Sequence, residues 1–230
     1  MVNEKSSRRH FVKASSAIAA SSVLTAPYVA SAQNSSKTLK VGLVGIGGRG
    51  SGAAAQAMGA DDNVALTAIG DLFEDRIKLR SRILKARGRD KYQVTPETTF
   101  TGFDAYKKAI DLADVVILTT PPGFRPYHFE YAIANGKHVF MEKPLATDPV
   151  GIRKVLATAK IAKAKKLNVV VGLQRHYQSK YIDLKQRVDE GAIGKIRGGQ
   201  VYWNDAGVWT KRRKAGQSEL EYQMRNWYYF

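Results

Sequence analysis

A glycine-rich turn directly after a short apolar run is the feature that most constrains the fold of this chain. The apolar run covers residues 39–44, and Gly45, Gly47 and Gly50 follow it with the spacing G-x-G-x-x-G. The first glycine allows a tight turn, the second lets the backbone approach a pyrophosphate, and the third lets a helix pack closely on a strand. Between a strand and a helix, this spacing predicts a dinucleotide site; a turn with a purely structural role is the alternative. The residues expected to contact the cofactor here are Gly45, Gly47, Gly48, Arg49 and Gly50.

Segments typical of strands and helices alternate after this turn. Helices are expected over 53–58, 73–86, 104–112, 127–135 and 148–166, and strands over 39–44, 64–69, 115–119, 138–141 and 169–173, with a short strand near residue 100. Asp104 and Asp148 are the expected N-caps of the helices that begin at these residues. The strands are continuous apolar runs, as in sheets that are buried on both faces. Alternation at this spacing predicts an α/β fold, a Rossmann-type doubly wound parallel sheet with helices on both faces.

The chain is expected to have four parts. They are an export signal over 1–32, a linker over 33–36, a nucleotide-binding Rossmann domain over 37–174 and the beginning of a second α+β domain over 175–230. In the last part we expect a helix over 180–190 and a strand over 196–203.

An acidic residue ends the second expected strand. Asp71 lies 26 residues after Gly45, where a carboxylate can accept hydrogen bonds from the adenosine ribose and repel a 2′-phosphate. This position favours NAD over NADP as the cofactor. Asp71 can also cap the helix that begins near Phe73, and Arg76, one turn further on, could tolerate a phosphate.

Two further loops follow strands and should open onto the same crevice. Thr120, Pro121 and Pro122 end the strand from residue 115, and Glu142 and Lys143 end the next one. A lysine ammonium at that edge can donate to a substrate hydroxyl or carbonyl and stabilise a developing alkoxide. We expect Glu142 to orient it.

The glycine turn, the Thr-Pro-Pro turn and the segment Gly-Lys-His-Val-Phe-Met-Glu-Lys-Pro over 136–144 together resemble the Gfo/Idh/MocA oxidoreductase family. The similarity covers roughly residues 38 to 230, and its Glu-Lys-Pro stretch is the most specific part. The resemblance implies that Lys143 is catalytic and that the Lys143–Pro144 bond is cis. It also implies hydride transfer between NAD(P) and a secondary hydroxyl of a sugar or cyclitol.

The general base has no clear candidate in the sequence. His176 follows the strand ending near Leu173 and is the local imidazole, whereas His128 and His138 are interpreted as structural. In the family, the base is usually a histidine four residues after an acid, and no Asp-x-x-x-His pattern follows Lys143 here. Two other functions therefore stay open: an NAD-dependent glycosidase, and a non-enzymatic nucleotide- or sugar-binding module.

Residues 175–230 are few for a substrate domain, because a segment of this size buries only a marginal core. Aromatic residues gather in this part of the chain, and all three tryptophans lie there. We expect a truncated family member that binds cofactor without turnover, with a homo-oligomer formed by the full-length protein. Ordinary packing is the preferred interpretation of the aromatic residues, ahead of sugar binding.

The first residues resemble a twin-arginine export signal. Arg8 and Arg9 precede an aromatic residue and a lysine, an uncharged stretch covers 14–32, and it ends in an Ala-Ser-Ala cleavage pattern. We expect cleavage before Gln33, the twin-arginine translocase as a partner, and a periplasmic or otherwise exported location. An uncleaved anchor or a polar tail is the alternative.

The chain is strongly basic and lacks cysteine. Its formal net charge is +17, but the basic residues recur along expected helices such as 73–86, which indicates solvated helix faces and no nucleic-acid partner. The absence of cysteine excludes disulfides, thiolate metal sites and a cysteine nucleophile, and no metal site is expected.

Overall fold

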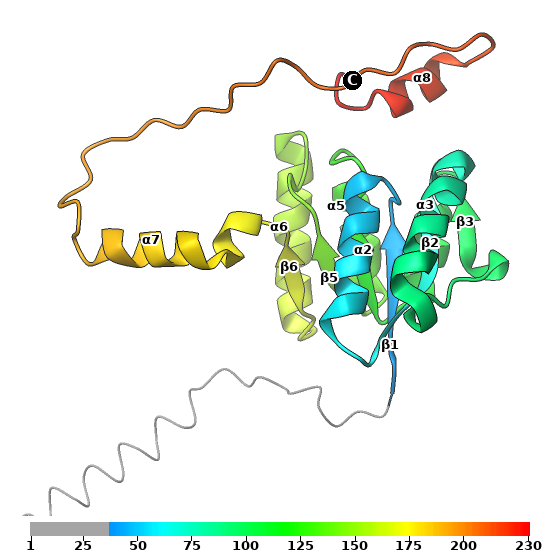
Figure 1. The fold of residues 1–230 in the computed structure, drawn as a ribbon, viewed down its shortest axis with the longest axis horizontal. Helices are drawn as coiled ribbons and strands as arrows, with labels where there is room; N and C mark the ends of the chain where they lie inside the picture. The colour runs from blue at the N-terminus through cyan, green and yellow to red at the C-terminus, as the bar shows by residue number, and fades with distance from the viewer. Residues whose placement is uncertain (1–36) are drawn as a thin grey trace, which may run out of the picture. The chain divides into compact units, whose positions relative to one another are not determined.

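A six-stranded parallel sheet organises the part of the chain that the computed structural model describes, residues 37–230 (Figure 1). The export signal and linker expected over 1–36 lie outside the described residues. The strands are β1 (Leu39–Val44), β2 (Val64–Asp71), β3 (Thr99–Thr101), β4 (Val115–Leu118), β5 (His138–Met141) and β6 (Val169–Val171). Their order is β3-β2-β1-β4-β5-β6, and every neighbouring pair is parallel. The order reverses between β1 and β4, the place where ligands bind in sheets of this kind.

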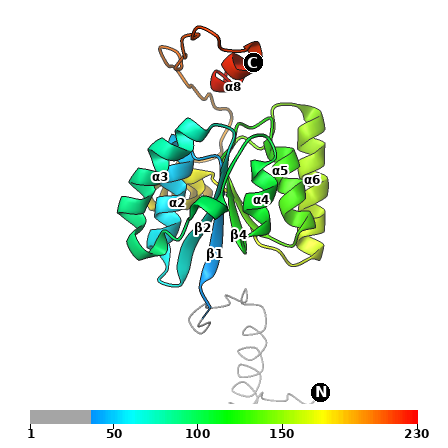
Figure 2. The same cartoon turned by 90° about the vertical axis from the view of Figure 1, so that its right-hand side faces the viewer.

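Helices cover both faces of the sheet (Figure 2). The helices are α2 (Gly48–Ala60), α3 (Glu74–Gly88), α4 (Ala105–Asp111), α5 (Arg125–Ala134), α6 (Pro149–Ala164), α7 (Ser179–Asp189) and α8 (Glu219–Arg225). Helices α2 and α3 pack on one face, whereas α4, α5 and α6 pack on the other. The predicted doubly wound α/β fold is therefore confirmed.

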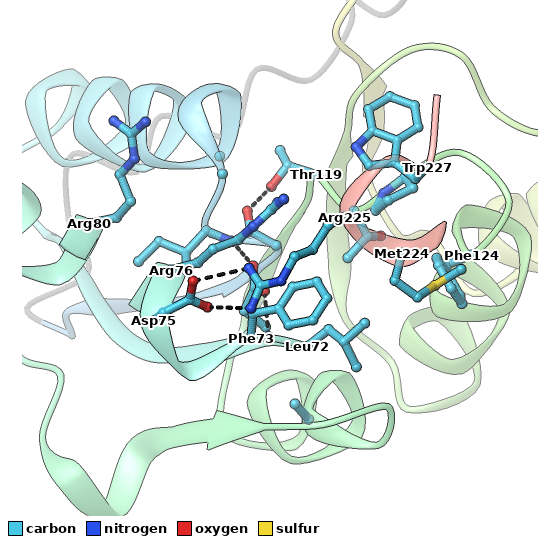
Figure 3. A pocket seen from close by; sticks show the side chains of 18 of the residues that line it. Leu72, Phe73, Asp75, Arg76, Arg80, Thr119, Phe124, Met224, Arg225 and Trp227 are labelled. Atoms are coloured by element: carbon cyan, nitrogen blue, oxygen red, sulfur yellow. Dashed lines mark hydrogen bonds and ion pairs between the residues drawn. The ribbon is translucent and has the colours of Figure 1, made fainter. Parts of the chain in front are cut away.

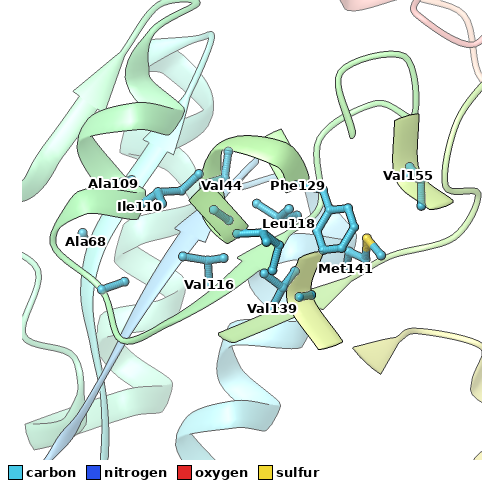
Figure 4. Packing of buried hydrophobic residues seen from close by; sticks show 14 residues of the cluster. Val44, Ala68, Ala109, Ile110, Val116, Leu118, Phe129, Val139, Met141 and Val155 are labelled. Carbon is cyan, nitrogen blue, oxygen red and sulfur yellow. The ribbon is translucent and has the colours of Figure 1, made fainter. Parts of the chain in front are cut away.

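Residues on the opposite faces of the inner strands β1, β2, β4 and β5 supply the two hydrophobic cores. In β1, Val41 and Leu43 face α2 and α3, and Val44 faces the opposite layer. In that layer Phe129 of α5 is completely buried against the central strands (Figure 4). Burial on both faces explains why the strands are uninterrupted apolar runs in the sequence.

Acidic capping residues were predicted at the N-termini of two helices. Asp148 accepts a hydrogen bond from the backbone N–H of Gly151 at 2.8 Å and is the N-cap of α6, as predicted. Asp104 precedes α4 but makes no capping hydrogen bond; its carboxylate pairs with Lys107 at 2.7 Å, a partner within the same turn. The prediction of a side-chain cap at Asp104 is thus wrong.

Beyond the sheet, one prediction is confirmed and another is wrong. The helix expected over 180–190 is α7, but residues 196–203 form no strand. An isolated extended segment leaves its backbone N–H and C=O groups without a ladder partner, and no described strand lies beside this one. Val201 is 99% exposed, so its β-branched side chain has no surface to pack on. Among residues 37–230, no helix has both the length and the apolar character needed to cross a membrane.

Candidate functional site

The glycine turn joins β1 to α2 in a conformation that side chains would prevent. Gly45 has φ +91°, and a Cβ at this position would lie 2.7 Å from the backbone nitrogen of Thr120. At Gly50 a Cβ would lie 1.9 Å from the carbonyl oxygen of Gly45 and 2.5 Å from Oγ1 of Thr119. These two glycines therefore allow the turn, the helix and the loop after β4 to pack in contact.

The middle of the same turn is open toward solvent. A Cβ at Gly47 or Gly48 would meet only the tips of Arg76 and Arg80, at 4.0 and 3.9 Å respectively. Gly47 is the N-cap of α2, without a capping side chain, and the first turn of the helix contains no acidic residue. The positive end of the helix dipole and two guanidinium groups thus surround the space above these glycines, an environment that suits a phosphate.

Asp71 connects the end of β2 to the glycine turn. Its buried carboxylate accepts hydrogen bonds from the backbone N–H groups of Ile46 at 2.8 Å and Phe73 at 3.0 Å. Burial raises the pKa of this carboxyl, and the two backbone hydrogen bonds oppose that effect. Helix α3 begins only at Glu74, so Asp71 holds the turn before the helix and is not its N-cap.

A cavity of about 910 Å³ lies at the carboxyl ends of the central strands (Figure 3). Such a volume is at the upper end of the range of small-molecule pockets. The predicted site residues that line it are Gly45, Gly47, Gly48, Arg49, Gly50, Asp71, Thr120 and Pro121. Pro122, Glu142, Lys143 and His176 are not among its lining residues.

Arg125, which no sequence pattern singles out, joins the two loops that follow β4 and β5. Its side chain is 2% exposed; it donates to the carbonyl oxygen of Thr120 through a short hydrogen bond and to that of Pro144 at 3.4 Å. Burial lowers the pKa of Arg125 to about 10, although the charge of Glu142 acts in the opposite direction. An arginine early in an amphipathic helix carries no sequence signal for this role, because the pattern does not show which way it points.

His128 lies beneath the same loop and lines the cavity. Its ring stacks on Tyr106 at 4.1 Å, and its Nδ1 is 3.1 Å from Oγ1 of Thr120. Burial lowers the pKa of His128 to about 3, and the charge of Arg125 adds to that effect. The imidazole is therefore neutral near pH 7 and supports the Thr120 loop.

Lys143 lies in the loop directly after β5 and is exposed to solvent. The Lys143–Pro144 peptide bond is cis, as the family resemblance implies. Glu142 does not orient this lysine: its Oε1 accepts a hydrogen bond from Nε of Arg49 at 2.7 Å. The carboxylate fits there because Gly172 leaves space; a Cβ on Gly172 would lie 2.8 Å from the same oxygen.

The two other histidines within residues 37–230, His138 and His176, do not line the cavity. His176 is exposed in the 3-10 turn Gln174–Tyr177. Nδ1 of His138 accepts a hydrogen bond from the backbone of Asn168 at 2.9 Å, which supports the interpretation of His138 as structural. Residues 37–230 contain no group of three or more His, Asp or Glu side chains that could hold a metal ion.

Comparison with known proteins gives a consistent result over the sheet. Residues 39–173 match the Gfo/Idh/MocA family model, described as an oxidoreductase family with an NAD-binding Rossmann fold. Inositol 2-dehydrogenase of Gluconacetobacter diazotrophicus is 30% identical over 161 residues, which are 69% of this chain and 44% of that protein. Inositol 2-dehydrogenase of Burkholderia cenocepacia is 33% identical over 166 residues, 68% of this chain and 43% of that protein.

Solved structures show the same similarity. Scyllo-inositol dehydrogenase of Lactobacillus casei, with bound NAD(H) and scyllo-inositol, has a TM-score of 0.55 and 29% identity; the match covers 69% of this chain and 43% of that one. Myo-inositol 2-dehydrogenase of Lactobacillus plantarum has a TM-score of 0.56 and 28% identity, over 70% of this chain and 43% of that one. The chain thus spans less than half the length of these relatives. With the glycine turn, Asp71 and the Glu-Lys-Pro loop in one Rossmann fold, the chain belongs to the Gfo/Idh/MocA family of NAD-binding oxidoreductases.

Proposed function

We propose that this protein oxidises or reduces a cyclitol or sugar at a secondary carbon, using NAD held at the carboxyl end of the sheet. The observation that carries the proposal is the open glycine turn beside Asp71, at the place where the strand order reverses. Inositol dehydrogenases among the relatives and solved structures support a cyclitol as the substrate class.

The residues at the turn fit a dinucleotide. The space above Gly47 and Gly48 is bounded only by guanidinium tips, so a diphosphate can approach the backbone and the start of α2. The Asp71 carboxylate, which lines the cavity, has acceptor capacity beyond its two backbone hydrogen bonds and would hold the adenosine ribose.

Lys143 would supply the polar group for the reacting oxygen. NAD, when bound, accepts or returns the hydride. In that reaction the Lys143 ammonium would donate a hydrogen bond to the substrate oxygen and stabilise the negative charge that develops there. Arg49 and Glu142 would keep the glycine turn and the lysine loop at a fixed separation, because their side chains bond across it.

Two measurements test this proposal. Calorimetric titration of residues 33–230 should show NAD binding, and a panel of inositols and sugars should then be assayed for NAD reduction. Lys143→Met should remove turnover while leaving NAD affinity unchanged. Failure to bind NAD would contradict the proposal, and NAD retention with hydrolysis and no net NADH would favour a glycosidase. Binding without turnover would contradict the catalytic part of the proposal and is the result expected of a truncated member or of a nucleotide-binding module.

We also propose that the protein is exported by the twin-arginine translocase. That route carries folded proteins, so the cofactor can be bound before export. Changing Arg8 and Arg9 to lysine keeps the charge of the signal but should hold the protein in the cytoplasm. Equal periplasmic amounts of both versions, measured by fractionation, would contradict the proposal.

A further inference from the structure

The segment from Trp209 to Trp227, which we call the C-terminal wall, forms one side of the cavity although it is far from the glycine turn in the sequence (Figure 3). It contains α8 and is held together by Asn226, whose side chain is buried. The Asn226 amide accepts from the backbone N–H of Lys211 at 2.6 Å and donates to the carbonyl of Lys211 at 3.1 Å. The wall is therefore folded on itself.

Arg225 joins this wall to the Rossmann fold. Nη1 and Nη2 of Arg225 donate to the two carboxylate oxygens of Asp75 at 3.0 and 3.3 Å, and the guanidinium lies 4.0 Å from the centre of the Phe73 ring. The Arg225 side chain is 20% exposed and that of Asp75 is 62% exposed, so the arginine is half-buried whereas its carboxylate partner faces solvent. Burial acts to raise the pKa of Asp75, but the hydrogen bonds and charge of Arg225 outweigh it and keep that pKa below its usual value.

The attachment point identifies the half of the cavity that the wall covers. Phe73 and Asp75 directly follow Asp71, at the end of β2, where the adenosine ribose of a dinucleotide lies in such sheets. The C-terminal wall therefore lies beside the adenosine end of the site. The reacting end lies toward the loops after β4 and β5.

Charge on the wall matches a diphosphate. Lys211, Arg212 and Lys214 line the cavity, and none has an acidic partner within residues 37–230. Arg76 and Arg80 face the glycine turn from α3, also without an ion pair in the described part of the chain. Positively charged side chains therefore lie on both sides of the space where a diphosphate would bind.

We propose that the C-terminal wall is part of the cofactor site and encloses the adenosine diphosphate half of NAD, with the Arg225–Asp75 pair as its attachment. The inference rests on the proposed NAD binding and adds residues 209–227 to that site. It makes the wall a determinant of cofactor affinity, in addition to the Rossmann fold.

Titration of the chain with NAD, ADP and nicotinamide mononucleotide tests this inference. Arg225→Ala should weaken the binding of NAD and of ADP by a similar factor, about tenfold, because the wall loses its attachment. The weaker binding of nicotinamide mononucleotide should not change. Asp75→Ala should also weaken NAD binding, and combining it with Arg225→Ala should cause little further loss of NAD affinity. Arg187→Ala in α7 removes an equal charge outside the cavity and is the matched control.

Tryptophan fluorescence gives a second measurement that does not depend on affinity. Trp209 and Trp227 line the cavity and lie 5.9 Å apart, whereas Trp203 is 81% exposed and outside it. At saturating NADH, excitation of tryptophan should sensitise cofactor emission in the unchanged chain and in Trp203→Phe, and much less in Arg225→Ala. If Arg225→Ala kept the NAD affinity and the sensitised NADH emission of the unchanged chain, this inference would be wrong but the proposed function would stand. If the unchanged chain did not bind NAD, both the inference and the proposed function would be wrong.

Discussion

The side chains of Arg49 and Glu142 meet at 2.7 Å and join the first turn of α2 to the loop that carries Lys143. Glu142 is 8% exposed, its carboxylate lies against Gly172, and Arg49 is the cation that hydrogen-bonds to it. One ion pair therefore connects the segment expected to hold the cofactor with the segment expected to act on the substrate. Removal of either partner should affect both.

We predict that Arg49→Ala lowers the free energy of unfolding by about 1–2 kcal/mol, because it leaves a largely buried carboxylate without its cation. Glu142→Gln should lower the free energy of unfolding by less, because a neutral amide has no charge to desolvate and its oxygen still accepts a hydrogen bond. Urea unfolding checks both values. Lys78→Ala, which breaks the exposed pair with Glu74, is the control and should change stability by less than about 0.5 kcal/mol. Equal effects of Arg49→Ala and Lys78→Ala would contradict the prediction.

Two glycines of α2 should respond oppositely to alanine. A Cβ at Gly50 would overlap the carbonyl oxygen of Gly45, so Gly50→Ala should destabilise the fold by about 2 kcal/mol or more and abolish NAD binding. A Cβ at Gly59 would have no neighbour within 4 Å, and Gly59→Ala should stabilise the helix by about 0.5 kcal/mol. Thermal unfolding and calorimetric titration measure the two effects. Normal cofactor affinity in Gly50→Ala would exclude the turn from the binding site.

Asp71 should determine the preference between NAD and NADP. Its carboxylate can accept from the ribose hydroxyls and repels a 2′-phosphate, so the unchanged chain should bind NAD more tightly. Asp71→Ala should reduce the difference in affinity between NAD and NADP, because Arg76 remains nearby to attract the 2′-phosphate of NADP. Calorimetry with both cofactors tests this. Tenfold tighter binding of NADP by the unchanged chain, equivalent to about 1.4 kcal/mol, would show the assignment to be wrong.

His128 should make stability fall in acid. Its pKa is about 3 in the folded protein, against an ordinary value of 6.5, so between these pH values the unfolded chain binds a proton that the folded chain does not. Its contribution to stability is complete above pH 6.5 and is lost progressively as the pH falls toward 3. The melting temperature of His128→Gln should depend less on pH across this window. His176→Gln, a change at an exposed site, should follow the unchanged chain; identical pH profiles for all three would contradict the prediction.

Local patterns were sufficient to predict the sheet and its order of elements. The glycine spacing after residues 39–44 and the capping acid Asp148 each report on a few consecutive residues, whose backbone conformation depends mainly on neighbours in the chain. The strand expected over 196–203 failed for the converse reason. Strand formation requires a neighbouring strand, and the apolar and aromatic residues at the end of this segment, Val201, Tyr202 and Trp203, do not contain the information that one is present.

The sequence by itself determined the class of fold and the position of the glycine turn, and it singled out Asp71, which lines the cavity. Only the tertiary structure decided which charged groups meet. Glu142 was expected to orient its neighbour Lys143 but pairs with Arg49, 93 positions away, and Arg225 reaches Asp75 across 150 positions. Pairings at that separation depend on how helices and loops pack around the sheet. A charge lowers its energy by binding whichever opposite charge the fold places within reach, and sequence proximity does not fix that choice.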